Sequence, residues 1–201
     1  GLYIIARPGP YIMAETINEG IPPWVFANYP QAAYVNQEGA SQNIVNYLHP
    51  DFIKCVSQWY REIFSVLAPR QVTRGGKIVL VQLDNEMGMI QWVRNSFDTN
   101  PDTMERFAAY LQHEYGSAIS NRYPEANLGN FLKESLMFPN GHSARLVVED
   151  YRSFYRSYLR EYASFLLSEA RANGLEVPPV INVHGFMNGG KTFAIGLSQL
   201  I

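Results

Sequence analysis

The sequence predicts an α/β fold in which a parallel sheet forms part of a (β/α)8 TIM barrel with helical insertions. Three apolar segments, residues 2–6, 78–83 and 179–183, have the length and composition of strands. Segments with helical periodicity separate them, and crossovers of that kind join parallel strands. Each strand ends in a polar or glycine-rich cluster, which is typical of a barrel. An open doubly wound sheet is the structural alternative.

The composition excludes several classes of partner. The chain has 201 residues, a formal net charge of −2 and 47% apolar residues, which is enough for a sizeable core. A charge this close to zero gives no argument for nucleic acid or a membrane surface as a partner. Cys55 is the single cysteine, and the four histidines include no pair at metal-ligand spacing. We therefore expect no metal and no cofactor, while the oligomeric state and the compartment stay open.

The two ends of the sequence predict a fragment. Residue 1 is glycine rather than methionine, and the first residues already have a strand pattern. The last residues, from Ser198 to Ile201, carry no terminal signal. A whole barrel takes about 250 residues, and only three strands are recognisable. We therefore expect residues 1–201 to be one piece of a single barrel domain that begins before residue 1 and continues beyond Ile201.

The first strand, which we expect to be buried, leads into a rigid loop over residues 7–15. Two prolines and a glycine stop the strand and restrict the backbone that follows. Such a loop can hold Arg7, Tyr11 and Glu15 at fixed positions. A second loop follows at residues 18–24, and after it comes a polar stretch rich in asparagine and glutamine.

Helical spacing of apolar residues accounts for most of the remaining chain. The first helix begins at a proline, with an aspartate in its first turn, and we expect its Trp59 to belong to the core. A glycine-, proline- and asparagine-rich insertion over residues 116–143 should contain short helical turns. The predicted helices cover residues 49–67, 100–115 and 144–173.

The segment over residues 77–88 holds the strongest candidate for a functional site. An apolar run rich in β-branched residues stops abruptly at Asp84, Asn85 and Glu86, and glycines lie on both sides of it. In α/β folds, polar residues at the carboxyl end of a buried strand lie where the chemistry takes place. The alternative is that Asp84 and Glu86 cap the next helix and are solvated.

Glu15 and Glu86 follow two strands that we expect to be neighbours, which places two carboxylates on one face of the sheet. Paired carboxylates cleave glycosidic bonds, one as acid and the other as nucleophile or base. Asn85 could donate a hydrogen bond to a sugar hydroxyl. Spacing in the sequence does not distinguish retaining from inverting chemistry. The structural alternative pairs Glu15 with Arg7 and leaves Glu86 as a helix cap.

Aromatic residues near the strand ends could stack on a sugar ring, although most aromatic residues in such a chain belong to the core. The candidates are Tyr11, Trp24 and Trp92. Trp24 lies beside prolines in the second loop, which makes it the better candidate for the wall of a site.

Residues 185–192 match the phosphate-loop pattern G-x-x-x-x-G-K-[ST] and follow a strand. A phosphate loop should open a helix, but Gly196 lies where that helix would run. A nucleotide-binding protein is therefore kept as an alternative. Otherwise this segment is a glycine-rich loop over the mouth of a barrel, with His184 and Asn188 available to a ligand.

Three ordered motifs resemble glycoside hydrolase family 35, the β-galactosidases. They are RPGPYIMAE at residues 7–15, NEGIPPW at 18–24 and GGKIVLVQLDNEMG at 75–88. The family typically has R-P-G-P-Y-I-x-A-E, then G-G-(L/I)-P-x-W, then G-G-P-I-I-x-x-Q-(V/I)-E-N-E-Y-G. Lys77, Asp84 and Met87 depart from this pattern, where Pro, Glu and Tyr are usual.

The resemblance implies a retaining (β/α)8 glycosidase that releases terminal β-galactose. Glu86 matches the general acid/base, Asn85 matches the asparagine that contacts the sugar, and Glu15 matches a glutamate that binds galactose hydroxyls. No position matches the nucleophile, which we expect beyond Ile201, so the isolated fragment should be inactive. A catalytically inactive carbohydrate-binding barrel remains an alternative.

Overall fold

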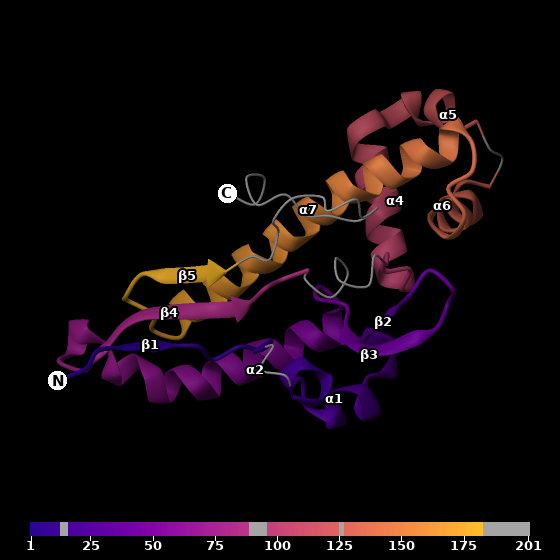
Figure 1. The fold of residues 1–201 in the computed structure, drawn as a ribbon. Coiled ribbons are helices and arrows are strands. Elements are labelled where there is room, and N and C mark those ends of the chain that lie inside the picture. Colours follow the sequence, from indigo (N-terminus) through magenta and orange to yellow (C-terminus); the bar gives the residue numbers. More distant parts are fainter. Residues whose placement is uncertain (13–15, 89–95, 125–126, 183–201) are drawn as a thin grey trace.

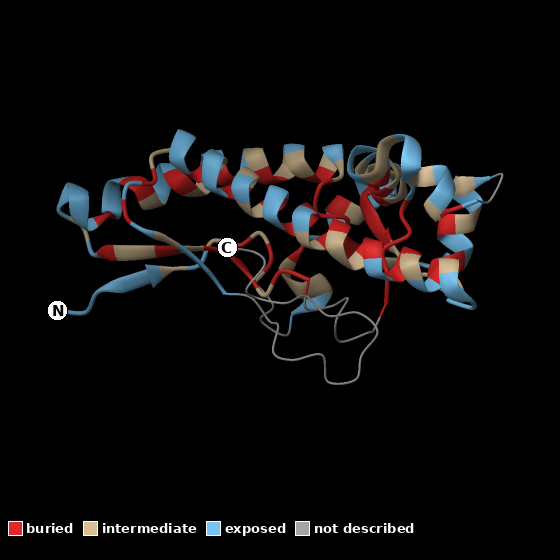
Figure 2. Cartoon of the chain, turned by 90° about the horizontal axis from the view of Figure 1, so that it is seen from above, coloured by how far each residue is buried: buried red, intermediate tan, exposed pale blue. Residues whose placement is uncertain are grey.

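The fold is an α/β arrangement, as predicted, in a computed structural model that describes residues 1–12, 16–88, 96–124 and 127–182. A small sheet lies beside two long helices, α2 (Pro50–Leu67) and α7 (His142–Ala172) (Figure 1). The buried positions lie where these helices face the sheet, and they continue along α7 into the helical end of the molecule, away from the sheet (Figure 2). Among the described residues, no helix is both long and apolar enough to cross a membrane.

The sheet contains the three predicted strands, β1 (Ile4–Ala6), β4 (Ile78–Asn85) and β5 (Pro179–Asn182). They run parallel in the order β1-β4-β5, so the prediction that the first two are neighbours is confirmed. Gln82 pairs with Val180 and Asn85 with Asn182, so β4 advances one residue more than its partner. This bulge lies directly before the polar end of β4, and bulges re-aim the side chains around them.

The prediction that the first strand is buried is wrong. Ile4 is 49% exposed and Ile5 is 55% exposed, because β1 lies at the edge of the described sheet and has β4 as its single neighbour there. β5 at the other edge is similar, with Val180 and Ile181 more than a third exposed. An apolar run predicts a strand, but its burial depends on elements that the run itself does not specify.

The first predicted helix is α2. His49 caps it by accepting a hydrogen bond from the Asp51 N–H through Nδ1, at 3.3 Å. The prediction that Trp59 belongs to the core is wrong, since its side chain is 42% exposed. It lies on the rim of the apolar face and donates from Nε1 to the Pro8 carbonyl at 2.8 Å, so it fastens the loop after β1 to the helix.

The polar stretch after residue 24 contains more structure than the sequence predicted. Trp24 lies in a short helix, α1 (Pro23–Asn28), rather than in a loop. An antiparallel hairpin follows, formed by β2 (Ala33–Val35) and β3 (Ser41–Val45). The two strands are only three and five residues long, and polar side chains on β3 obscure their apolar pattern. Short 3-10 turns, η1 (Ile17–Gly20) and η2 (Pro30–Ala32), flank α1.

The insertion and the long helix match the predictions. α4 (Pro101–Tyr115) begins after Asn100, whose side chain accepts from the Asp102 N–H at 2.9 Å. The remaining elements are η3 (Ala68–Arg70), η4 (Val72–Arg74), η5 (Gly116–Ala118), α5 (Ile119–Arg122) and α6 (Leu128–Met137). α4, α5 and α6 gather around the first half of α7, away from the sheet (Figure 1).

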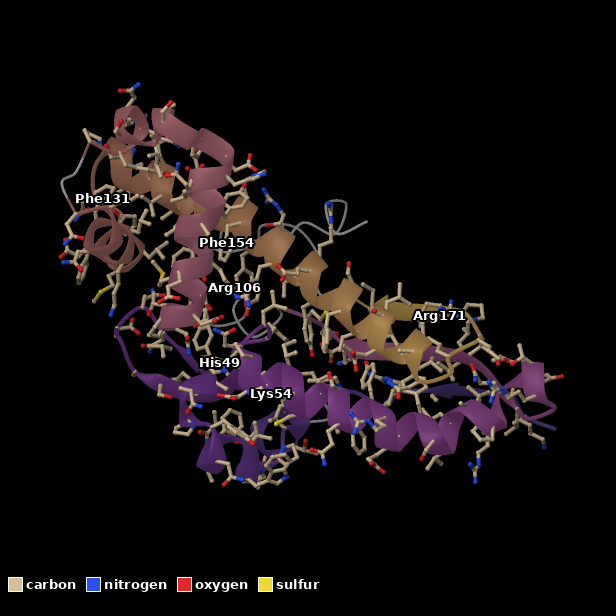
Figure 3. The ribbon with its side chains drawn as sticks, turned by 180° about the vertical axis from the view of Figure 1, so that it is seen from behind. His49, Lys54, Arg106, Phe131, Phe154 and Arg171 are labelled. Atoms are coloured by element: carbon tan, nitrogen blue, oxygen red, sulfur yellow. The ribbon has the colours of Figure 1, made fainter. Side chains whose placement is uncertain are left out.

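Aromatic packing joins α4 to α7. Phe154 of α7 lies 5.3 Å from Phe107 and 5.7 Å from Tyr110, measured between ring centroids. Arg106 of the same helix α4 reaches across to the start of α2, where it donates to the Leu48 carbonyl at 3.2 Å. Figure 3 shows Phe154 and Arg106 on this side of the molecule, with His49 at the start of α2. Helix α4 is therefore fixed to the same core as the sheet.

Candidate active site

The carboxyl ends of the three parallel strands bring together four polar residues. Arg7 follows β1, Asn85 ends β4, Glu86 comes next, and Asn182 ends β5. The Arg7 Nη2 donates to Asn85 Oδ1 at 2.6 Å. The Glu86 N–H donates to the Asn182 carbonyl at 3.1 Å. The structure thus assembles three of the predicted site residues, Arg7, Asn85 and Glu86, across three strands.

Glu86 has an unusual backbone conformation. Its φ angle is +50°, in the left-handed region that non-glycine residues adopt at a cost of roughly 1–2 kcal/mol. The hydrogen bond from its N–H to the end of β5 stabilises this conformation, and the side chain is half-buried. Strained backbone of this kind is concentrated at functional sites, where the surrounding structure enforces it.

Gln82 joins the strand ends to one another, and sequence reasoning did not find it. Its Nε2 donates to Asn85 Oδ1 at 3.0 Å, to Asn182 Oδ1 at 2.7 Å and to the Asp84 carbonyl at 2.9 Å. The available signal was a polar side chain inside an otherwise apolar strand. Asn182 was missed as well, because only the register of β5 against β4 gives it a role.

Asp84 points away from this cluster into the core, where it is 1% exposed. Its Oδ1 accepts the Asn85 N–H at 2.8 Å, and the phenol of Tyr162 lies beside it. Burial raises the pKa of Asp84 to about 8, against the lowering effect of its hydrogen bonds. Within the described part of the chain, Asp84 Oδ2 and the Tyr162 hydroxyl have no well-aligned hydrogen-bond partner. Asp84 is therefore a core residue that supports the end of β4.

Tyr11 lies in the core as well, at 1% exposure. Its hydroxyl accepts the Val45 N–H at 2.9 Å, and its ring centroid is 5.4 Å from that of Tyr47. Desolvation raises the pKa of the Tyr11 phenol, so the side chain is neutral. Tyr11 thus fixes the loop after β1 to strand β3.

Trp24 lines a separate, largely apolar pocket of about 310 Å³, with its own side chain 50% exposed. Trp59 and Cys55 of α2 form the opposite wall, and Pro8 and Pro10 connect the pocket to the loop after β1. None of the described lining residues belongs to the cluster at the strand ends. The structure therefore does not bring Trp24 to Glu86.

Other predicted residues lie outside the described part of the chain: Glu15, Trp92, His184, Asn188 and the phosphate-loop-like segment 185–192. Their predicted roles are untested. The chain end at Ile201 lies outside it too, so the structure does not test the expectation that the nucleophile follows Ile201.

The chemistry of the assembled cluster follows from its side chains. Among the described residues, no group of three or more His, Cys, Asp or Glu side chains could hold a metal ion. The cluster consists of one carboxylate, from Glu86, one guanidinium, from Arg7, and the amides of Gln82, Asn85 and Asn182. Such a set suits the binding of hydroxyl groups and the transfer of a proton.

Comparison with known proteins places this geometry in a family. The sequence pattern of glycosyl hydrolases family 35 matches residues 1–127, more than half of the chain. The chain belongs to glycosyl hydrolase family 35. The matched region includes β1, β4 and the whole segment from Arg7 to Glu86, so the predicted family is confirmed.

Three proteins illustrate the sequence similarity of this family 35 chain to known enzymes. A β-1,2-glucosyltransferase of Ignavibacterium album is 28% identical over 95% of this chain and 28% of its own length. An exo-β-D-glucosaminidase of Thermococcus kodakarensis is 33% identical over 50% of this chain and 13% of its own length. A probable β-galactosidase E of Aspergillus fumigatus is 33% identical over 59% of this chain and 10% of its own length. The chain thus spans less than a third of each relative.

Solved structures agree on the fold. The β-galactosidase of the psychrophilic Marinomonas ef1 superimposes with a TM-score of 0.65 at 12% identity, over 86% of this chain and 26% of that one. The β-galactosidase of Bacillus circulans sp. alkalophilus gives a TM-score of 0.60 at 17% identity, over 82% of this chain and 25% of that one. At these identities the similarity concerns the arrangement of the backbone.

Proposed function

We propose that this chain carries the acid/base half of the active site of a retaining glycosidase that releases terminal β-galactose. The observation that carries the proposal is the placement of Glu86 at the end of the central strand β4, beside the buried Asn85 and in a strained backbone conformation. In family 35, to which the chain belongs, these two positions match the acid/base and its neighbouring asparagine. The substrate is accordingly a carbohydrate.

In the proposed mechanism, protonated Glu86 gives its proton to the glycosidic oxygen as the bond to the leaving group breaks. A glutamate nucleophile, which we place beyond Ile201, attacks the anomeric carbon and forms a covalent glycosyl-enzyme. Glu86, now a carboxylate, removes a proton from the water that releases the sugar. Asn85 holds a sugar hydroxyl through these steps.

The remaining predicted contacts have different support. Glu15 and His184 are proposed as ligands of sugar hydroxyls on the strength of sequence alone. Arg7 lies within the cluster at the strand ends and can act there, directly or through Asn85. The burial of Tyr11 and the separate pocket of Trp24 favour indirect roles, in which each supports the described residues 8–12 after β1.

We also propose that the three parallel strands are a segment of a (β/α)8 barrel that is completed by chain outside residues 1–201. The exposed apolar side chains on both edge strands, β1 and β5, support this, since further strands on each side would cover them. The helices α2 and α7 then belong to the outer ring. On this proposal the isolated 201 residues are inactive.

A second candidate is glycosyl transfer to an acceptor sugar. It is favoured by the β-1,2-glucosyltransferase of I. album, whose similarity extends over 95% of the chain and so beyond residue 127, where the family match ends. Transfer would use a covalent glycosyl-enzyme of the same kind, carrying glucose instead of galactose. In transfer, Glu86 would deprotonate a sugar hydroxyl instead of water.

The test uses Glu86→Gln in the complete enzyme, with Glu62→Gln on the exposed side of α2 as a control of equal change. Loss of turnover on disaccharides, with dinitrophenyl glycosides still forming the glycosyl-enzyme, is expected because that leaving group needs no proton. Added azide should then restore turnover and give a β-glycosyl azide. Wild-type activity of Glu86→Gln on disaccharides would refute the assignment.

The products separate the candidates. Free galactose of β configuration indicates retaining hydrolysis, whereas a β-1,2-linked glucoside indicates transfer. If the protein binds sugar but forms neither product, the result would support the catalytically inactive carbohydrate-binding barrel. Nucleotide affinity that disappears on Lys191→Ala would support the nucleotide-binding alternative instead.

A further inference from the structure

The amide groups at the strand ends can each take only one orientation, because their neighbours have fixed hydrogen-bonding roles. Arg7 can only donate, so the Asn85 atom 2.6 Å from its Nη2 is Oδ1. The Asp84 carbonyl can only accept, so the Gln82 atom 2.9 Å from it is Nε2. The Glu86 N–H can only donate, and it lies 3.3 Å from Asn182 Oδ1. Gln82 Nε2 contacts both of these Oδ1 atoms, so all the assignments agree.

The β-bulge is what makes this network possible. Gln82 and Asn85 are three residues apart, and in a regular strand residues three apart point to opposite faces. The extra residue of β4 opposite β5 restores both side chains to one side. Gln82 then shares its two N–H hydrogens among three acceptors, one of them on β5.

The orientation of Asn85 has a chemical consequence. Its Oδ1 is occupied by two donors, from Arg7 and from Gln82. Its Nδ2 therefore points away from both, and within the described residues this nitrogen has no hydrogen-bond partner. Asn85 is only 6% exposed, so the hydrogen bonds of its neighbours decide which way its amide faces. The side chain can offer a substrate a donor but not an acceptor.

We propose that Gln82 and Arg7 are positioning residues that lock Asn85 as a hydrogen-bond donor to one sugar hydroxyl. The inference deepens the proposed glycosidase function and rests on it. Asn85 touches the substrate, whereas Gln82 acts through it and through Asn182. The site accordingly requires a substrate hydroxyl that accepts a hydrogen bond at this place.

The test uses Gln82→Glu in the complete enzyme. The carboxylate has nearly the same shape as the amide, but places an acceptor against the three acceptors that Gln82 now serves. The Asn85 amide should turn its nitrogen toward this carboxylate and withdraw it from the sugar. Gln82→Met, similar in length and without a donor, provides a second variant that introduces no charge. Gln58→Glu on the exposed side of α2 is the matched control.

The readout is kcat/KM on an aryl β-glycoside of the preferred sugar and on its monodeoxy analogues. In the wild type, the analogue that lacks one particular hydroxyl should show the largest fall in kcat/KM. In Asn85→Ala, that analogue should lose no more than the others. In both Gln82 variants, kcat/KM on the parent glycoside should fall by about tenfold to a hundredfold. Removing that same hydroxyl from the substrate should then lower kcat/KM no more than removing any other hydroxyl. Gln58→Glu should behave as wild type.

Two results would overturn the positioning role. One is a Gln82 variant that keeps the wild-type penalty for each hydroxyl. The other is an equal loss on the parent and all analogues, which would mean that Gln82 is merely structural. Failure of the proposed function is separate, because it would appear as wild-type activity in Glu86→Gln, whatever the Gln82 variants do.

Discussion

Replacing Asp84 with asparagine is expected to stabilise the protein at neutral and alkaline pH. Burial raises the pKa of Asp84 to about 8, whereas an aspartate in an unfolded chain titrates near about 3.9. Between these values the folded protein holds a proton that the unfolded chain has released. The free energy of unfolding therefore falls as the pH rises from about 4 to about 8. Below about pH 4 both states are protonated, and the penalty disappears.

The size of the effect follows from the shift. One pKa unit corresponds to about 1.4 kcal/mol, so a shift of about four units sets a ceiling of roughly 5.5 kcal/mol at pH 8 and above. We expect about half of this, because a buried charge is partly relieved by local relaxation and by water. Asparagine keeps an oxygen that accepts the Asn85 N–H and adds an N–H donor next to the Tyr162 hydroxyl. The substitution therefore removes no hydrogen bond from Asn85 or from Tyr162.

The assay is the midpoint of thermal unfolding at pH 5, 7 and 8.5 for the wild type, Asp84→Asn and the exposed control Glu62→Gln. The difference between Asp84→Asn and wild type should grow by about 4–8 °C between pH 5 and 8.5, because about three of the four units lie in this interval. Burial also raises the pKa of Asp98, to about 6, but both proteins share that contribution, so it cancels. A difference that does not change with pH, or a less stable Asp84→Asn at pH 8.5, would refute the reasoning.

Three further substitutions test the surroundings of the site. Tyr11→Phe removes the acceptor of the Val45 N–H and should lower the free energy of unfolding by about 1–3 kcal/mol; a raised KM at unchanged stability would instead place Tyr11 against the substrate. Asn100→Ala removes the cap of α4 and two donations to backbone carbonyls leading into β2, and should cost about 2–3 kcal/mol by the same measure. Asp150→Asn weakens the bidentate ion pair with Arg122 and should lower the free energy of unfolding by about 1.5–3 kcal/mol. The loss should appear as faster proteolysis within residues 116–137, whereas Glu62→Gln should be cleaved at the wild-type rate.

The parts of the fold that were predictable from the sequence are those with a long or regular local pattern. α2, α4 and α7 repeat apolar residues over many turns, and β4 is an apolar run bounded by glycines. The hairpin of β2 and β3 was missed because strands of three and five residues carry too little alternation to stand out from a polar stretch. The exposure of β1 was missed because burial depends on neighbours far away in the sequence.

The candidate site divides in the same way. Arg7, Asn85 and Glu86 could be proposed because polar residues directly after an apolar strand are visible in the sequence. Gln82 and Asn182 could not, because their contact crosses between strands far apart in the sequence and exists only in one register. A shift of one residue in that register would turn the side chains of β5 to the other face and remove the contact.

The end of β4 shows why local alternation gave an incomplete account of Asp84, Asn85 and Glu86. Strict alternation would place Asp84 and Glu86 on one face and Asn85 on the other. The bulge and the left-handed conformation of Glu86 instead send Asp84 into the core beside Tyr162 and turn Asn85 toward Gln82. The departure of Asp84 from the family pattern, where glutamate is usual, therefore lies on the core side. It should change the packing around Tyr162 and the pH dependence of stability, and leave the choice of sugar to Asn85 and its neighbours.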